Sequence, residues 1–270
     1  MTMVVRHMPD YAEITLAGPV QASSIYTLCD TIDQAVDQFY YEHVMLRISS
    51  PGGETQALRY FLSHLDTWHQ RGVVIETQAM AECSSAAAVM SSLGSRGHRI
   101  ADQRHSRLLW HFARMPSDAV LGREANRHAG GLTARAGAAV VKQLAEVQET
   151  IRRDDDFMVH ALMSHICGGN VAQPDDWFGE GFLRRKYFLQ QHLNKALELA
   201  NRSACHWSSR DEKAIRILCD QLYRDVHSPD VAAAFLEVEI RTMLDQDRHC
   251  SPLEAWCLFL IDDFGGAKND

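Results

Sequence analysis

In the first half of the chain, segments with the apolar pattern of a strand alternate with segments with the apolar pattern of a helix. Short apolar or alternating runs are typical of strands, and they cover residues 11–16, 44–48, 73–77, 99–101 and 107–110. Between them, apolar residues three and four positions apart predict helices over residues 23–39, 54–70 and 84–93. The run at 44–48 is mostly hydrophobic, as in a strand that is covered on both faces of its sheet. This alternation predicts an α/β fold with parallel strands joined by crossovers.

Beyond residue 111 the pattern is helical. An Ala- and Gly-rich stretch is followed by an acidic run, Asp-Asp-Asp, that predicts the start of a separate helix ending near His165. Further helices are expected over residues 183–200 and, in two or three pieces, over 208–264. We therefore expect one α/β domain over residues 1–200 and a helical C-terminal extension over residues 201–270.

Composition narrows the class of protein. Hydrophobic residues make up 46% and charged residues 23% of the chain, as in a soluble globular protein. The net charge of −8 argues against a nucleic-acid partner. Seven cysteines without a Cys-x-x-Cys pair predict reduced thiols. There is no signal-peptide pattern and no apolar run of the roughly 18 residues that a membrane span needs, so we expect a cytoplasmic protein with no membrane association.

Three short motifs could together carry out nucleophilic catalysis. Gly52 and Gly53 follow a strand, Ser85 precedes an Ala-rich helix that begins with Ala86, and His111 ends another strand. A serine hydrolase needs a nucleophile, a base and backbone N–H groups aimed at an oxyanion. These residue types in this order therefore predict a serine hydrolase site.

Each motif also has a structural interpretation. Ser85, like Ser84 beside it, could serve only as a helix cap, which is the default role of a serine before an Ala run. His111 is one of 14 histidines and could be a core residue at a strand end. The glycine pair could be only a turn after Pro51. The spacing of the motifs favours the catalytic interpretation over these alternatives.

The residue sequences of these motifs are similar to those of a known family. Residues 48–53, Ile-Ser-Ser-Pro-Gly-Gly, are similar to an Asn-Ser-Pro-Gly-Gly segment, and residues 83–85, Cys-Ser-Ser, stand in the place of Ala-Ala-Ser. Gly-His-Arg at 97–99 and the strand at 106–111 follow in the expected order. At these residues the chain resembles the proteolytic subunit of the Clp protease, a branch of the crotonase-like superfamily. The resemblance covers about residues 11–200.

The resemblance implies a crotonase-like core of ββα units and the activity of a serine endopeptidase. In that family pattern, Ser85 is the nucleophile and His111 the base, and the N–H groups of Gly52 or Gly53 and of Ala86 hold the oxyanion. It also implies a polypeptide substrate, a ring-shaped homo-oligomer and an ATPase unfoldase as partner. The Ala- and Gly-rich segment 123–151 would lie at a subunit contact. No metal or organic cofactor is implied.

The third member of the triad departs from the family pattern. Lys186 stands where the family carries its aspartate, in the stretch Arg-Lys-Tyr-Phe. A carboxylate from the preceding loop, which holds Asp175 and Asp176, or a backbone carbonyl could orient His111 instead. Glu180 is our preferred candidate, because its glycine neighbours allow the loop to bend inward; an exposed loop carboxylate is an equally good interpretation of it.

Two other functions stay open on the sequence alone. Lys186 favours a catalytically inactive paralogue that acts as a ring or scaffold subunit. A crotonase-like acyl-CoA enzyme would use the glycine turn on a thioester and would not need a serine and a histidine at this spacing. A metal site is not expected, because the nearest histidine pairs, at 64 and 69 and at 160 and 165, do not share a helix face well.

Overall fold

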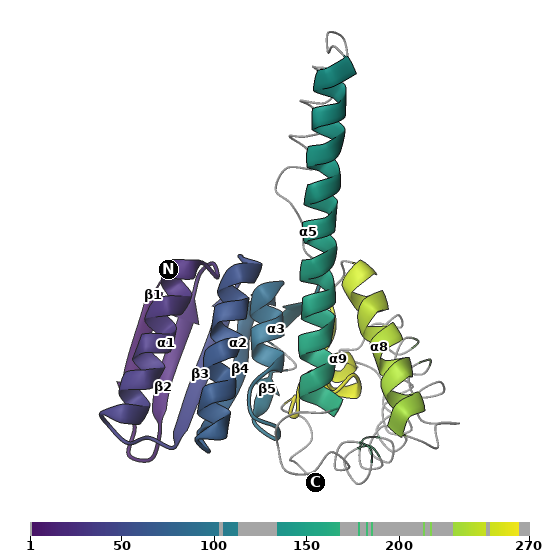
Figure 1. Cartoon of the computed structure of the whole chain (residues 1–270). Coiled ribbons are helices and arrows are strands. Elements are labelled where there is room, and N and C mark those ends of the chain that lie inside the picture. The colour runs from purple at the N-terminus through teal and green to yellow at the C-terminus, as the bar shows by residue number, and fades with distance from the viewer. Residues whose placement is uncertain are drawn as a thin grey trace.

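A six-stranded mixed sheet with helices packed against it forms the centre of the molecule (Figure 1). The computed structural model describes residues 2–102, 105–112, 134–167, 178, 182, 185, 213, 217, 229–246 and 249–264. The strands are β1 (Thr2–His7), β2 (Ala12–Ala17), β3 (His43–Ser50), β4 (Val74–Ser84), β5 (Arg99–Ala101) and β6 (Arg107–Leu109). The helices within these ranges are α1 (Ala22–Asp37), α2 (Thr55–Gln70), α3 (Ala86–Ser92), α5 (Ala134–Cys167), α8 (Pro229–Gln246) and α9 (Pro252–Cys257).

The strands lie in the order β1-β2-β3-β4, and all neighbours except β1 and β2 are parallel. The long strand β4 carries two short strands on its outer edge. Its middle pairs with β5 at Thr77, and its end pairs with β6 at Ser84. Helices α1, α2 and α3 are the crossovers between consecutive parallel strands, which confirms the predicted α/β fold.

Alternation along β3 shows how the sheet builds its core. Val44, Leu46 and Ile48 are fully buried, whereas the residues between them are only partly buried. A parallel strand packed against helices on one face shows this period of two. The expectation that this strand is covered on both faces was wrong within the described residues, because the polar residues His43 and Arg47 occupy the second face.

The structure differs from the sequence-based expectations at three further points. Strand β1 was not predicted, and β4 continues to Ser84, so that the following helix starts at Ala86. Helix α5 runs unbroken from Ala134 to Cys167, without a new start at the acidic run. There the carboxylates pair with neighbouring helices: Asp154 lies 3.1 Å from the Arg59 guanidinium of α2, and Asp156 lies 3.1 Å from that of Arg241 in α8. Charged partners on packed neighbours explain a mid-helix acidic run that looks like a helix start.

The last described segment, residues 249–264, packs against β5 and β6 at the outer edge of the sheet. Cys250 forms a backbone bridge to Leu108 of β6, and Asp263 forms one to Ile100 of β5. The extension predicted from residue 201 is therefore in contact with the sheet, while the domain boundary at residue 200 stays a prediction. Among the described helices, none combines the length and the apolar character that crossing a membrane requires.

Candidate active site

Ser85 occupies a strained turn between β4 and α3. Strand β4 ends at Ser84 and the helix begins at Ala86, so a single residue makes the reversal. Its backbone angles, φ 57° and ψ −130°, lie in a region that residues with a side chain rarely adopt. The Ser85 N–H donates a 2.7 Å hydrogen bond to the Leu109 carbonyl of β6, which anchors the turn. A serine on a sharp strand-to-helix turn has the geometry of a nucleophile elbow.

The glycine pair lies directly against this turn. A Cβ atom on Gly52 would come within 2.5 Å of both the Ser85 Cβ and the Ser84 carbonyl oxygen. One on Gly53 would come within 1.9 Å of the Val20 carbonyl oxygen, and Gly52 also has a positive φ of 91°. Both positions therefore require glycine, and the segments predicted to form one site are brought together.

Three backbone N–H groups near Ser85 differ in their availability to a substrate oxyanion. The Gly52 N–H is already used, because it donates to the Ser50 hydroxyl at 3.0 Å. In the described part of the chain, no hydrogen bond uses the Gly53 N–H. The Ala86 N–H opens helix α3, where the first N–H groups have no partner inside the helix. The geometry thus favours Gly53 and Ala86 over Gly52 as oxyanion donors.

Ser84 and Ser85 have different surroundings. Ser84 is 4% exposed, and its hydroxyl has no hydrogen-bond partner among the described residues. Ser85 is only partly buried and lies beside the glycine turn. A nucleophile must meet a substrate, so Ser85 is the better placed of the two.

His111 follows strand β6, whose register with the end of β4 brings it to the same end of the sheet as Ser85. Its Nδ1 lies 2.6 Å from the carbonyl oxygen of Phe112. A carbonyl can only accept, so Nδ1 carries a proton, and in the neutral ring Nε2 is then the acceptor. That is the tautomer in which a histidine can take a proton from a serine hydroxyl.

The candidates for the third triad member lie outside the described residues. These are the carboxylates of Asp175, Asp176 and Glu180, and Lys186, which replaces the family's aspartate, also lies outside the described residues. Their roles therefore stay predictions. Sequence reasoning had named a backbone carbonyl only as a general possibility and had not found the one of Phe112, since every residue type supplies that acceptor.

Sequence reasoning also did not assign Ser50, whose hydroxyl fixes the Gly52 N–H. A signal was present, because Ser50 aligns with the serine of the Asn-Ser-Pro-Gly-Gly pattern. Sequence reasoning also missed the Leu109 carbonyl, which accepts the Ser85 N–H, because a backbone acceptor has no side-chain signal.

The fold and this turn define an α/β protein that presents a serine between a strand and a helix. No protein-family model matches the chain. Over 143 residues the chain is 30% identical to the ATP-dependent Clp protease proteolytic subunit 4 of Rhodococcus jostii (strain RHA1), a match that covers 52% of this chain and 68% of that protein. The chain therefore belongs to the family of Clp protease proteolytic subunits.

Proposed function

We propose that this protein is a serine endopeptidase of the Clp type. The observation that carries the proposal is the strained Ser85 turn packed against Gly52, where an added Cβ would come within 2.5 Å of the Ser85 Cβ. Strained backbone of this kind is retained where it positions a reacting group. Membership in a family of proteolytic subunits supports the same reaction class.

In the proposed reaction the Ser85 hydroxyl attacks the carbonyl carbon of a peptide bond. His111 Nε2 takes the hydroxyl proton and returns it to the leaving amine. The N–H groups of Gly53 and Ala86 hold the oxyanion, and water then hydrolyses the acyl-enzyme. The Phe112 carbonyl, at 2.6 Å from His111 Nδ1, keeps the imidazole in the required tautomer.

The proposal extends to assembly and substrate. As a Clp-type subunit of the crotonase-like superfamily, the protein would act on polypeptides inside a homo-oligomeric ring. An ATPase unfoldase would supply those polypeptides in unfolded form. The name of the Rhodococcus relative, an ATP-dependent protease subunit, supports this extension.

Hydrolysis of short fluorogenic peptides tests the proposal, because short peptides need no unfolding. We expect turnover by the full chain and a loss of roughly a thousandfold or more in Ser85→Ala and in His111→Ala. Ser84→Ala is the matched control and should keep its activity. A Glu180→Gln variant with a similar loss would identify the third triad member, whereas full activity would leave the Phe112 carbonyl in that place. No turnover by the unaltered chain over a broad peptide set would favour the inactive paralogue.

A further inference from the structure

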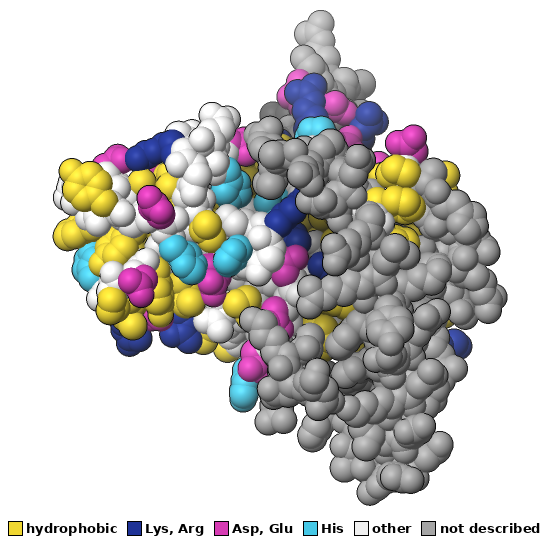
Figure 2. Space-filling model, turned by 90° about the horizontal axis from the view of Figure 1, so that it is seen from below, with side chains coloured by type: hydrophobic (Ala, Val, Ile, Leu, Met, Phe, Trp, Pro, Cys, Tyr) yellow, Lys and Arg dark blue, Asp and Glu magenta, His cyan; other side chains and the backbone are white. Residues whose placement is uncertain are grey.

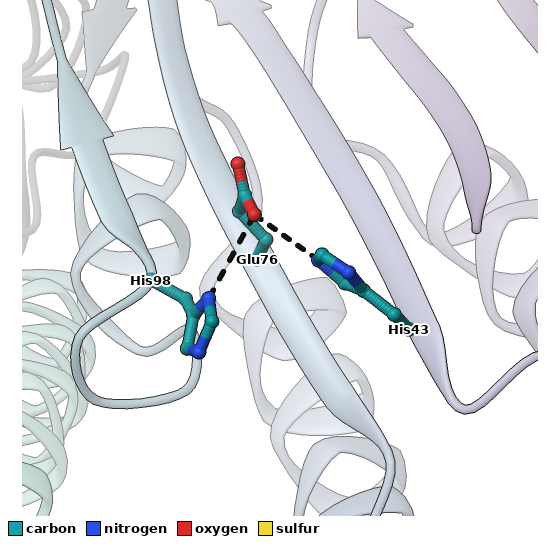
Figure 3. Close-up of side chains that lie close together, drawn as sticks. All are labelled: His43, Glu76 and His98. Atoms are coloured by element: carbon teal, nitrogen blue, oxygen red, sulfur yellow. Dashed lines mark hydrogen bonds and ion pairs between the residues drawn. The ribbon is translucent and has the colours of Figure 1, made fainter. Parts of the chain in front are cut away.

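Three potential metal ligands converge on the second face of the sheet. His43 begins β3, Glu76 lies on β4, and His98 precedes β5, so the three come from neighbouring strands. Figure 3 shows both imidazole rings turned toward the Glu76 carboxylate. Figure 2 shows histidine side chains gathered beside acidic ones on the face seen from below. No local sequence pattern predicts this group, because its members are distant in the chain.

The spacing of the donor atoms suits a small divalent cation. Glu76 Oε2 lies 3.0 Å from His43 Nε2 and 3.7 Å from His98 Nδ1. All three donor atoms lie within 4.8 Å of one another. Metal–ligand bonds of about 2.0–2.1 Å at tetrahedral angles place donors roughly 3.3 Å apart. The two shorter separations bracket this value, so small side-chain rotations would complete the site.

The charge balance of this sheet face also points to a cation. Glu13 lies on the same face and pairs with two guanidinium groups, those of Arg6 at 3.1 Å and Arg47 at 3.5 Å. Glu76 has a side chain only 12% exposed, yet within the described residues its ion pairs are with His43 and His98 alone. A mostly buried carboxylate needs a compensating charge, and a divalent cation bound between the carboxylate and the two imidazoles would supply one.

The backbone holds the most exposed of the three ligands in place. The His98 carbonyl accepts a 2.9 Å hydrogen bond from the Thr77 N–H of β4. On either side of His98, the Asp262 carboxylate accepts from the Gly97 N–H at 2.8 Å and from the Arg99 N–H at 3.2 Å. Ligands on fixed backbone lose little freedom when they bind a metal.

We propose that His43 Nε2, Glu76 and His98 Nδ1 bind one divalent transition-metal ion, with Zn²⁺ as the best fit. Two imidazoles and one carboxylate are a common zinc ligand set, and they leave a fourth position open. His98 and His43, with side chains 44% and 32% exposed, put that position at the solvent. A bound ion would connect β3, β4 and the residue just before β5. Residues of β4 rise about 3.3 Å each, so Glu76 is about 26 Å from Ser84, and the metal site is independent of the proposed peptidase site.

Calorimetric titration of the metal-free full chain with Zn²⁺, together with the visible absorption of bound Co²⁺, tests this site. We expect one equivalent of ion per chain and a higher melting temperature with Zn²⁺. His98→Ala and Glu76→Gln should each weaken binding at least about tenfold. His105→Ala is the matched control, because the exposed His105 ring also lies beside a carboxylate, that of Asp102 at 2.9 Å. The His105→Ala variant should bind Zn²⁺ with the affinity of the unaltered chain.

Glu76→Gln separates loss of metal from loss of fold. Its amide can still hydrogen-bond His43, so the metal-free melting temperature should stay close to that of the unaltered chain. A chain that binds no Zn²⁺ would overturn the proposal. An affinity for Zn²⁺ in the Glu76→Gln and His98→Ala variants that equals that of the unaltered chain would overturn it too, because the bound ion would then lie elsewhere.

Discussion

Ser85 shows how one residue can connect conformation with chemistry. With φ 57° and ψ −130° it carries a conformational cost of roughly 1–3 kcal/mol that most serines avoid. The 2.7 Å bond from its N–H to the Leu109 carbonyl and the close contact with Gly52 hold it there. The motif around the glycine pair predicted this meeting of segments. The strain itself could not be predicted, because it depends on the register between β4 and β6.

The strain predicts an order of stability among variants of Ser85. Ser85→Gly should be more stable to urea than Ser85→Ala by about 1 kcal/mol, because glycine adopts these angles without a Cβ clash. This estimate is net of the larger unfolded-state entropy of glycine. Urea unfolding of the two variants measures the difference. If Ser85→Ala were equally stable or more stable, the turn would not be strained.

Helix α5 shows the limits of reading an element from its sequence. Its acidic run suggested a boundary, yet the helix is continuous because Asp154 and Asp156 pair with neighbouring helices. The carboxyl-terminal end of α5 packs against the residues that follow α3. There the Arg96 guanidinium donates to the carbonyl oxygens of His165 and Ile166. His165 Nε2 donates to the Gly94 carbonyl at 2.7 Å. The helical period predicted helix in this region, but the partners that decide its length are far away in the chain.

His165 gives this docking contact a pH dependence. Burial, together with nearby Arg99, lowers the pKa of His165 from 6.5 to about 3. The unfolded chain therefore binds a proton at a higher pH than the folded chain does. The stabilising contribution is complete above about pH 6.5 and is lost as the pH falls toward about 3, by up to about 1.4 kcal/mol per pH unit.

We expect His165→Gln to flatten this part of the pH profile of unfolding free energy. The glutamine amide can still donate to the Gly94 carbonyl, so the docking contact is kept. His160→Gln is the control, since His160 is exposed on the same helix. Urea unfolding between pH 4 and pH 7 measures the slope; an unchanged slope in His165→Gln would show that another group controls it.

At the scale of the whole molecule, residues near the C-terminus complete the core of the sheet. The Arg99 guanidinium, 3% exposed, binds both carboxylate oxygens of Asp262 at 2.6 and 2.7 Å. Burial alone would raise the pKa of Asp262, but Arg99 and Arg185 lower it to about 2.

The fold class of residues 1–112 followed from periodicity, whereas the long-range ion pair between Arg99 and Asp262 had no local signal. The third triad member was equally hard to predict, because its usual position holds Lys186.

Assembly is the other property of the whole molecule. The amino-terminal half of α5 extends well beyond the sheet (Figure 1), and a helix that projects in this way suits contact with a second copy. We propose a homo-oligomer with part of segment 123–151 at the contact. Sedimentation velocity at micromolar concentration should give a species larger than a monomer, and Val141→Trp should shift it toward smaller species. Val238→Trp, on the exposed face of α8, is the matched control. A monomeric chain, or an assembly that Val141→Trp leaves unchanged, would contradict this contact.

The most direct test of the account is covalent labelling with a fluorophosphonate probe, followed by mass spectrometry of the intact chain and its peptides. The account predicts one adduct per chain, mapped to Ser85, which is retained in Ser84→Ala and lost in Ser85→Ala. Labelling measures the nucleophile without depending on substrate, ring or partner. A folded chain that takes up no probe, or an adduct on Ser84 or another serine, would contradict the assignment of Ser85 as the nucleophile.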